Sequence, residues 1–186
     1  MSPSEKVTIQ TVRNRREFNQ FVKFPYVLYE DDKAWVPPLV GDFKKYVKGE
    51  GNYLNQSGPN EKIIAIRDGE VCGRLLVGIN EHLNNHKNLK EGYISLFECE
   101  NDQETAGLML EFAEAWLVER GMEFVKGPLS LPGGDDNRGF LIDNFTDSTL
   151  IMNTYNKPYY PEMFEEFGFE KYCDVYAYKS DSANEN

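Results

Sequence analysis

The sequence has few of the residues that build metal centres and histidine-based catalytic sites. It contains two histidines and three cysteines in 186 residues, and no cysteine pair has the Cys-x-x-Cys spacing of zinc and redox motifs. His82 and His86 are four residues apart with no third ligand nearby, so we expect a polar loop there and no metal. The odd number and wide spacing of Cys72, Cys99 and Cys173 predict buried thiols in a reducing cytoplasm.

Long apolar runs and an excess of positive charge are also missing. No run reaches the roughly 18 residues that a membrane-spanning helix needs, and the N-terminus lacks the apolar stretch of a signal peptide. Lys and Arg number 20 against 31 Asp and Glu, and the net charge of −11 repels phosphate backbones and anionic lipids. The sequence therefore predicts a cytoplasmic protein with neither nucleic acid nor a membrane as a partner.

The composition is otherwise that of a globular protein. Hydrophobic residues make up 40% of the chain and aromatic residues 13%, which suffices for a sizeable core and argues against disorder. No internal repeat or low-complexity linker divides the chain. We therefore expect a single domain over residues 1–186, with its core at about 7–178 and a frayed polar tail at 179–186.

Hydrophobic periodicity predicts an alternation of strands and helices. Strands are expected at 7–13, 62–67, 70–79, 93–98, 123–126 and 172–178, and helices after Asn14 and at 42–47, 104–120 and 158–167. Asp68-Gly69 is a dipeptide preferred in tight hairpin turns. We expect Pro25 to bend or stop the first helix, and 49–60 to be a surface loop. The irregular stretch at 128–156 is unusually long for a connection, which indicates a functional role.

This order and several short motifs resemble the GCN5-related N-acetyltransferase (GNAT) superfamily. The motifs are Phe24-Pro25-Tyr26-x-Leu28-Tyr29 leading to Trp35-Val36-Pro37-Pro38, the Gly127-Pro128-Leu129 turn, Tyr155-Asn156-x-Pro158-Tyr159-Tyr160, and a short helix that ends in Gly168-Phe169. They are similar to a poorly characterised bacterial GNAT-like family that includes longer members. The resemblance covers about residues 7–178 and implies an α/β (α+β) fold. In that fold a mixed, mostly antiparallel central sheet is flanked by helices, and its fourth and fifth strands splay apart.

The resemblance also implies acetyl-CoA or another acyl-CoA as co-substrate. The pantetheine arm would lie between the splayed strands, beside Leu96, Phe97 and Glu98. The pyrophosphate would lie at the N-terminus of the next helix, where free backbone N–H groups favour an anion. The residues implied for this turn are Asn101, Gln103, Glu104, Thr105 and Ala106, and Asn156 is a further cofactor-binding residue.

The turn departs from the family pattern in ways that weaken its fit to a diphosphate. Asn101 lacks a long donor side chain, and Glu104 stands where the family has Gly. Asp102 and Glu104 would place two carboxylates near the phosphates. Helix capping by Asn101 or Asp102 is the simpler explanation of these residues, with Asn101-x-x-Glu104 resembling a capping box. We therefore expect any acyl-CoA to bind weakly.

Four residues are candidates for catalysis. Family enzymes often use a Tyr four residues before the final Gly as proton donor, and the residue here is Phe164, which cannot donate. Tyr160 is the first substitute because residues four apart share a helix face, and Tyr155 replaces it if Pro161 leaves Tyr160 outside the helix. Glu98 is placed to take the proton of the amine, directly or through water, and Glu100 is an alternative base. Packing of the tyrosines and solvation of the glutamate are the alternative explanations.

The long segment at 128–156 is the expected acceptor site. Asp135 and Asp136 suit a cationic amine, and Arg138 suits an anionic group. The leading function is therefore acyl-CoA-dependent transfer of an acyl group, most simply acetyl, to an unknown amine on a small molecule or protein. The alternatives are a non-catalytic GNAT-like module that binds a small molecule or partner protein, and a structural half of a larger assembly. A homodimer remains possible.

Overall fold

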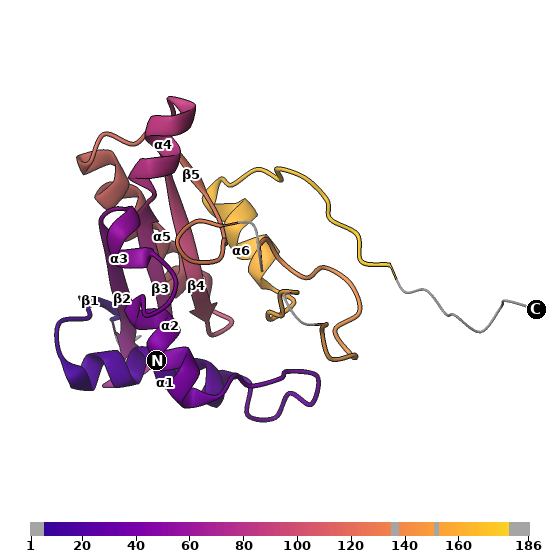
Figure 1. Ribbon diagram of the computed structural model, residues 1–186. Helices are drawn as coiled ribbons and strands as arrows, with labels where there is room; N and C mark the ends of the chain where they lie inside the picture. The colour runs from indigo at the N-terminus through magenta and orange to yellow at the C-terminus, as the bar shows by residue number, and fades with distance from the viewer. Residues whose placement is uncertain (1–5, 135–137, 151–152, 179–186) are drawn as a thin grey trace, which may run out of the picture.

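A five-stranded sheet forms the centre of the computed structural model, which describes residues 6–134, 138–150 and 153–178 (Figure 1). The strands are β1 (Thr8–Thr11), β2 (Asn60–Arg67), β3 (Glu70–Ile79), β4 (Glu91–Cys99) and β5 (Phe124–Lys126), in that order across the sheet. Neighbouring strands are antiparallel except for β4 and β5, which are parallel. The mixed, mostly antiparallel sheet confirms the predicted fold class.

Helices cover both faces of this sheet. The helices are α1 (Arg15–Leu28), α2 (Val40–Lys48), α3 (Leu54–Ser57), α4 (Glu81–Lys87), α5 (Gln103–Glu119) and α6 (Tyr160–Phe167). Strand residues alternate between two cores, so that Leu75 and Val77 pack with α5 and α6 while Leu76 packs with α1, α2 and α3. The helix α4 lies between β3 and β4 in the chain, at one end of the sheet (Figure 1).

The turn between β2 and β3 has the conformation that its sequence predicts. Asp68 has a φ of 55° and Gly69 a φ of 83°, both in the left-handed region. A two-residue hairpin turn with positive φ at both positions matches the right-handed twist of the strands, and Asp-Gly tolerates it well. Local sequence alone therefore accounts for this hairpin.

The first helix runs past Pro25, so this proline does not stop it. Its start is fixed by a capping box between Asn14 and Glu17. Proline has no N–H to donate to the carbonyl of Phe21, four residues earlier, and this loss ordinarily ends a helix. Here the Nη1 of Arg74, on β3, donates to that carbonyl at 2.8 Å. A residue distant in sequence therefore satisfies the group that Pro25 leaves free.

Two segments predicted as loops contain short helices. Residues 49–60 include α3, whose Leu54 is buried in the core beneath α1 and α2. Residues 80–90 include α4, whose N-cap Asn80 accepts a hydrogen bond from the N–H of Leu83 at 3.0 Å. His82 and His86 are both exposed on α4. Within the described residues, no group of three His, Cys, Asp or Glu side chains is arranged to hold a metal ion.

The predicted final strand at 172–178 is wrong. These residues are exposed and form no strand, and the chain leaves the body of the molecule after α6 (Figure 1). A strand needs a neighbour to take its backbone hydrogen bonds, and in the described residues none lies along this segment. Cys173 is consequently exposed, which corrects the prediction of a buried thiol there, whereas Cys72 and Cys99 are buried as predicted.

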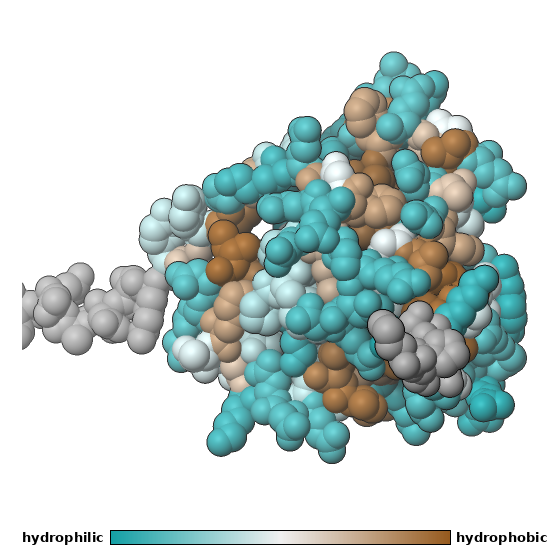
Figure 2. Space-filling model, turned by 180° about the vertical axis from the view of Figure 1, so that it is seen from behind, coloured by the Kyte–Doolittle hydropathy of each residue, from teal (hydrophilic) through white to brown (hydrophobic). Residues whose placement is uncertain are grey.

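The surface agrees with the acidic composition. Figure 2 shows a mostly hydrophilic face interrupted by separate apolar patches, as expected for a chain with a net charge of −11. Among the described helices, none combines the length and apolar character needed to cross a bilayer. Asp135, Asp136 and the predicted polar tail at 179–186 lie outside the described residues.

Candidate functional site

The pairing of β4 with β5 ends early and opens a wedge between them. It covers Glu91 to Tyr93 of β4, after which the N–H of Leu129 donates to the carbonyl of Ile94 at 2.9 Å. Beyond that point β4 is accompanied by α6, because the Phe97 ring packs against Tyr160 at a centroid distance of 5.1 Å. The splay of the fourth and fifth strands is therefore present, and α6 closes its far end.

A bulge in β4 decides which way Glu98 faces. Two residues of β4, Leu96 and Phe97, lie opposite the single Leu75 of β3, and Leu96 has a φ of 53°. The extra residue shifts the alternation of side chains by one. Phe97 therefore joins the core around α5 and α6, and Glu98 turns toward the end of α1.

The carboxylate of Glu98 is held by two tyrosines and an arginine. Its Oε2 accepts hydrogen bonds from the hydroxyls of Tyr29 and Tyr160, each at 2.8 Å. Its Oε1 lies 3.8 Å from Nη2 of Arg74, the residue directly opposite on β3. These partners come from the end of α1, the start of α6 and the middle of β3, so the site exists only in the folded chain.

Burial sets the electrostatics of this cluster. It raises the pKa of Glu98 above its ordinary value, and Arg74 and the two phenols offset only part of the rise. Burial and the nearby Glu98 also raise the pKa of Tyr160 and of Tyr29, so both phenols stay protonated and serve as donors. A carboxylate with a raised pKa suits general base chemistry near neutral pH.

Arg74 is a buried cation that does not use all of its N–H groups in hydrogen bonds. Its Nη1 bonds the Phe21 carbonyl, and its guanidinium lies over the rings of Phe21 and Phe43 at 5.0 and 5.2 Å. Among the described residues, its Nε is a buried side-chain nitrogen without a hydrogen-bond partner. The positive charge of Arg74 thus balances the negative charge of Glu98, and its hydrogen bond to the Phe21 carbonyl links α1 to β3.

Aromatic and charged side chains pack against one another next to Glu98. Tyr29 stacks on Trp35 at a centroid distance of 4.9 Å. The hydroxyl of Tyr155 donates to Asp32 at 2.8 Å. The ammonium of Lys157 lies 4.6 Å from the centre of the Tyr29 ring and 3.7 Å from Asp32. The segment after α1 and the segment before α6 therefore meet over the Glu98 cluster.

Other residues predicted for this region have structural partners. The amide of Asn156 is buried, accepts from the N–H of Leu141 at 2.6 Å and donates to the carbonyl of Lys157 at 2.9 Å. These hydrogen bonds hold the long segment at 128–156 against the residues before α6. Arg138 is exposed. Phe164, at the position of the family's proton donor, is a core residue that packs on Phe97 at 4.8 Å.

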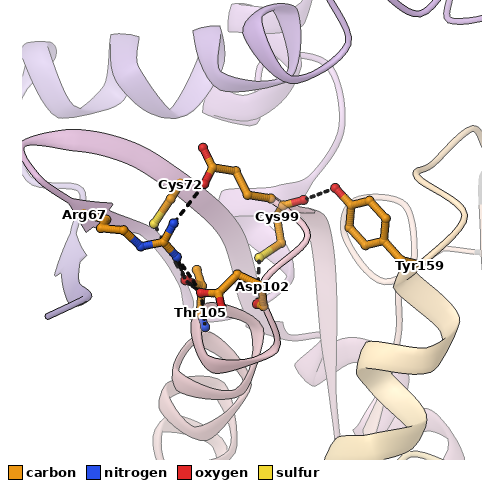
Figure 3. A network of polar contacts seen from close by, with 7 residues as sticks. Arg67, Cys72, Cys99, Asp102, Thr105 and Tyr159 are labelled. Carbon is orange, nitrogen blue, oxygen red and sulfur yellow. Dashed lines mark hydrogen bonds and ion pairs between the residues drawn. The ribbon is translucent and has the colours of Figure 1, made fainter. Parts of the chain in front are cut away.

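A second polar cluster occupies the N-terminus of α5 (Figure 3). Asp102 is the N-cap, and its Oδ2 accepts from the N–H of Thr105 at 3.0 Å and from the Thr105 hydroxyl. Arg67 pairs with the same carboxylate, donates to the Thr105 hydroxyl at 2.8 Å and bonds Glu100 at 3.1 Å. Burial raises the pKa of Asp102, but hydrogen bonds from Thr105 and the charge of Arg67 outweigh it, so the net shift is downward.

This cluster fills the place expected for a diphosphate. The carboxylate of Asp102 already takes a backbone N–H that a phosphate would use. The predicted capping box between Asn101 and Glu104 is not formed, because the helix begins one residue later and Asp102 caps it. The other turn residues point elsewhere, since Gln103 donates to the carbonyl of Met163 on α6 and Ala106 is fully buried.

Several residues of these two clusters escape prediction from sequence. In the sequence, Arg74 is one polar position within a predicted strand, and Arg67 is the last residue of another predicted strand. Tyr29 and Trp35 belong to motifs that resemble the bacterial GNAT-like family, and so does Tyr155. The sequence signal for the site is that the residues around Glu98 come from two regions with this resemblance, 24–38 and 155–160, which are far apart in the chain.

Comparison with curated proteins finds two relatives that are each about twice the length of this chain. The chain is 26% identical to protein YghO of Escherichia coli K12 over 174 residues, which are 91% of this chain and 43% of that protein. It is 23% identical to the bacterial ceramide synthase of Caulobacter vibrioides over 185 residues, which are 99% of this chain and 48% of that protein. No protein-family model matches the chain.

Comparison with solved structures identifies the fold. An aminoglycoside acetyltransferase from an uncultured soil sample, in complex with sisomicin, superposes with a TM-score of 0.56 and 13% identity, covering 94% of this chain and 97% of that one. A tandem GNAT protein of the clavulanic acid biosynthesis pathway gives 0.56 and 11%, covering 88% of this chain and 43% of that one. The chain has the GNAT fold, as its motifs predict.

Proposed function

We propose that this protein is an acyl-CoA-dependent N-acyltransferase that moves an acyl group, most simply acetyl, to an amine. The GNAT fold and its acetyltransferase neighbours support acyl transfer in general. The observation that carries the finer proposal is the Glu98 carboxylate, which is largely buried near the end of β4 and has a raised pKa. Its side chain keeps an exposed fraction of 14%, so part of it contacts solvent.

In the proposed reaction the amine attacks the thioester directly. Its nitrogen forms a bond to the carbonyl carbon, and the carbon–sulfur bond breaks to release a thiolate. Glu98 takes the proton that the nitrogen loses, directly or through one water molecule. Because both tyrosines bond Oε2, Oε1 is the oxygen that no phenol occupies.

Tyr160 stays the proposed donor of a proton to the thiolate. It is the first residue of α6, so the alternative in which Pro161 excludes it from the helix does not apply. Its hydroxyl is within 2.8 Å of both Glu98 and the N–H of Cys99. A protonated phenol in this position can pass its proton outward and recover one from the protonated Glu98.

The structure suits the pantetheine arm of acyl-CoA better than it suits the diphosphate. The stretch of β4 between Ile94 and Cys99, along which no strand of the described residues pairs on the side away from β3, suits the pantetheine arm. The N-terminus of α5 does not suit the diphosphate, because Asp102 and Arg67 already pair there. This mismatch favours the second candidate function, a GNAT-like module that binds a small molecule or a partner protein without catalysis.

A single substitution tests the proposal. Glu98→Gln keeps the shape of the side chain but removes the base, and we expect turnover to fall by roughly 10²- to 10⁴-fold in an acetyl-transfer assay over a panel of amines. Glu100→Gln, two residues further along the chain and exposed, is the matched control and should retain activity. Acetyl-CoA affinity measured by calorimetry should be equal in the parent protein and in Glu98→Gln.

The pH profile provides a second readout. Glu98 must be deprotonated to act as a base, so the rate should rise as the pH passes its raised pKa and stay level above it. The Glu98→Gln variant should lack this rise. An unmodified protein that neither binds acetyl-CoA nor acylates any amine on the panel would leave the non-catalytic module as the better description.

A further inference from the structure

One lysine of the chain lies beside the Glu98 cluster. The Nζ of Lys157 is 4.6 Å from the centre of the Tyr29 ring, and the hydroxyl of that ring donates to Glu98 at 2.8 Å. Tyr29 therefore contacts both a primary amine and the carboxylate. Burial raises the pKa of Glu98, and the charge of Lys157 offsets part of this rise. The amine is thus near enough to the carboxylate to act on it electrostatically.

Lys157 is enclosed but not fixed in its place. Its side chain is 20% exposed, and its Nζ lies 3.7 Å from Oδ2 of Asp32, which is too far for a hydrogen bond. Within the described residues this amine makes no hydrogen bond. Asp32 has a partner of its own, because its Oδ1 accepts from the Tyr155 hydroxyl at 2.8 Å. The flexible stem of Lys157 can therefore move without breaking a hydrogen bond.

A second lysine has the same two kinds of neighbour at a different place. The Nζ of Lys126 donates to Glu91 at 2.9 Å and lies 5.2 Å from the centre of the Tyr172 ring. Its side chain is 39% exposed. Glu91 is the first residue of β4, whereas Glu98 is near the end of that strand. Lys126 therefore has a carboxylate and a tyrosine beside it but not the Glu98 cluster, which makes it the matched comparison for Lys157.

We propose that Lys157 is an internal acyl acceptor, an inference that rests on the proposed function because it uses the same base and the same thioester. The ammonium of Lys157 first gives one proton to solvent, which leaves a neutral amine. The nitrogen then bonds the carbonyl carbon of the thioester, and the carbon–sulfur bond breaks with its electron pair on sulfur. Glu98 takes the second proton of the nitrogen. The products are an amide at Lys157 and the thiolate of coenzyme A.

Peptide mass spectrometry of the unmodified protein, incubated with an excess of acetyl-CoA, tests this inference. Chemical acetylation by the free thioester favours the more exposed amine, and therefore Lys126 over Lys157. Transfer at Glu98 predicts the opposite order, and we expect Lys157 to be acetylated about tenfold faster than Lys126 or more. Because the base and the acceptor belong to one chain, the rate per molecule should be the same at all protein concentrations.

Variants show whether Glu98 carries the transfer. Glu98→Gln should slow acetylation of Lys157 by roughly 10²- to 10⁴-fold and leave the slow acetylation of Lys126 unchanged. Glu100→Gln, at an exposed position, should acetylate Lys157 at the parent rate. In a mixture with the unmodified protein, an isotope-labelled Glu98→Gln chain should stay unacetylated at Lys157, because the transfer occurs within one molecule.

The outcomes separate this inference from the proposed function. If free amines are acetylated in a Glu98-dependent reaction but Lys157 is acetylated no faster than Lys126, the internal acceptor is wrong and the proposed function stands. If neither free amines nor Lys157 are acetylated, both are wrong. Acetylation of Lys157 that persists in Glu98→Gln, or a rate per molecule that rises with protein concentration, also contradicts the inference.

Discussion

At the scale of single residues, the proposed chemistry rests on Glu98. A carboxylate at the end of a strand is ordinarily solvated. Here Tyr29, Tyr160 and Arg74 replace the solvent, and burial raises the pKa of the carboxylate. The phenols matter because a hydrogen bond to the charged form of an acid lowers its pKa. They therefore set how far the pKa of Glu98 rises.

Removing either phenol should move the pH profile of the reaction. In Tyr29→Phe and in Tyr160→Phe the carboxylate loses one donor, so the pKa of Glu98 should rise further. The acid limb of the kcat/KM profile should shift to higher pH by the same amount. Tyr159→Phe is the matched control, because the Tyr159 hydroxyl bonds the carbonyl of Cys99 instead of Glu98. If the acid limb of the profile does not shift in either variant, the two phenols do not set the pKa of Glu98.

The same pair of variants separates a positioning role from proton donation. If Tyr160 also supplies the proton to the thiolate, Tyr160→Phe should lower turnover by about ten- to ten-thousand-fold, even at its own best pH. Tyr29→Phe should recover most of its turnover once the pH is raised. Equal recovery in both variants would mean that Tyr160 only positions Glu98.

At the scale of elements, the wedge follows from unequal strand lengths. β4 has nine residues and β5 has three, so six residues of β4 extend past the paired region. The bulge at Leu96 then turns Glu98 toward α1. α5 packs across the face of the sheet opposite α1 and holds the paired end together through Leu117, which lies over Gly92 of β4.

Two glycine substitutions test this packing with opposite signs. A Cβ at Gly92 would lie 2.1 Å from Cδ2 of the buried Leu117, so Gly92→Ala should lower the free energy of unfolding by about 1–3 kcal/mol. A Cβ at Gly107, within α5, would have no neighbour inside 4 Å, so Gly107→Ala should raise that free energy by about 0.5–1 kcal/mol. Urea unfolding of the two variants measures both effects. A Gly92→Ala protein as stable as the parent would show that β4 and α5 are less tightly packed.

At the scale of the whole molecule, the net charge of −11 opposes any anionic substrate. Acyl-CoA carries its negative charges in the diphosphate and phosphate groups. The N-terminus of α5 adds Glu100, Asp102 and Glu104 at the place where such groups would approach. Arg67 is already committed to two of these carboxylates. Long-range repulsion and the local geometry at the N-terminus of α5 therefore both disfavour the binding of acyl-CoA.

We expect acetyl-CoA to bind in the micromolar to millimolar range and to respond to salt. Added salt should tighten binding, because the screening length falls from about 30 Å at 0.01 M to about 8 Å at 0.15 M ionic strength. Glu104→Gly should also tighten binding. Glu114→Gly, which makes the same change on an exposed position further along α5, should not. Nanomolar binding by the unmodified chain, measured by calorimetry, would contradict this prediction.

How much could be predicted from sequence depends on the range of the interactions involved. The hairpin at Asp68-Gly69 and the cap at Asn14 are local, and both were predictable. The passage of α1 through Pro25 was not, because it needs a donor from Arg74 on another strand. Glu98 could be named as a candidate from its position on the fourth strand, but its partners could not, since they come from three separate elements.

The sequence by itself determined the GNAT fold, because its motifs and the periodicity of its strands and helices are local patterns that each element carries alone. Only the tertiary structure decided what the elements do together. It turned Glu98 toward α1 through a bulge and filled the N-terminus of α5 with Asp102 and Arg67. It also left 172–178 unpaired, although that segment has a strand's alternation. The physical reason is that a strand, a buried charge and a helix terminus are each completed by partners distant in the chain.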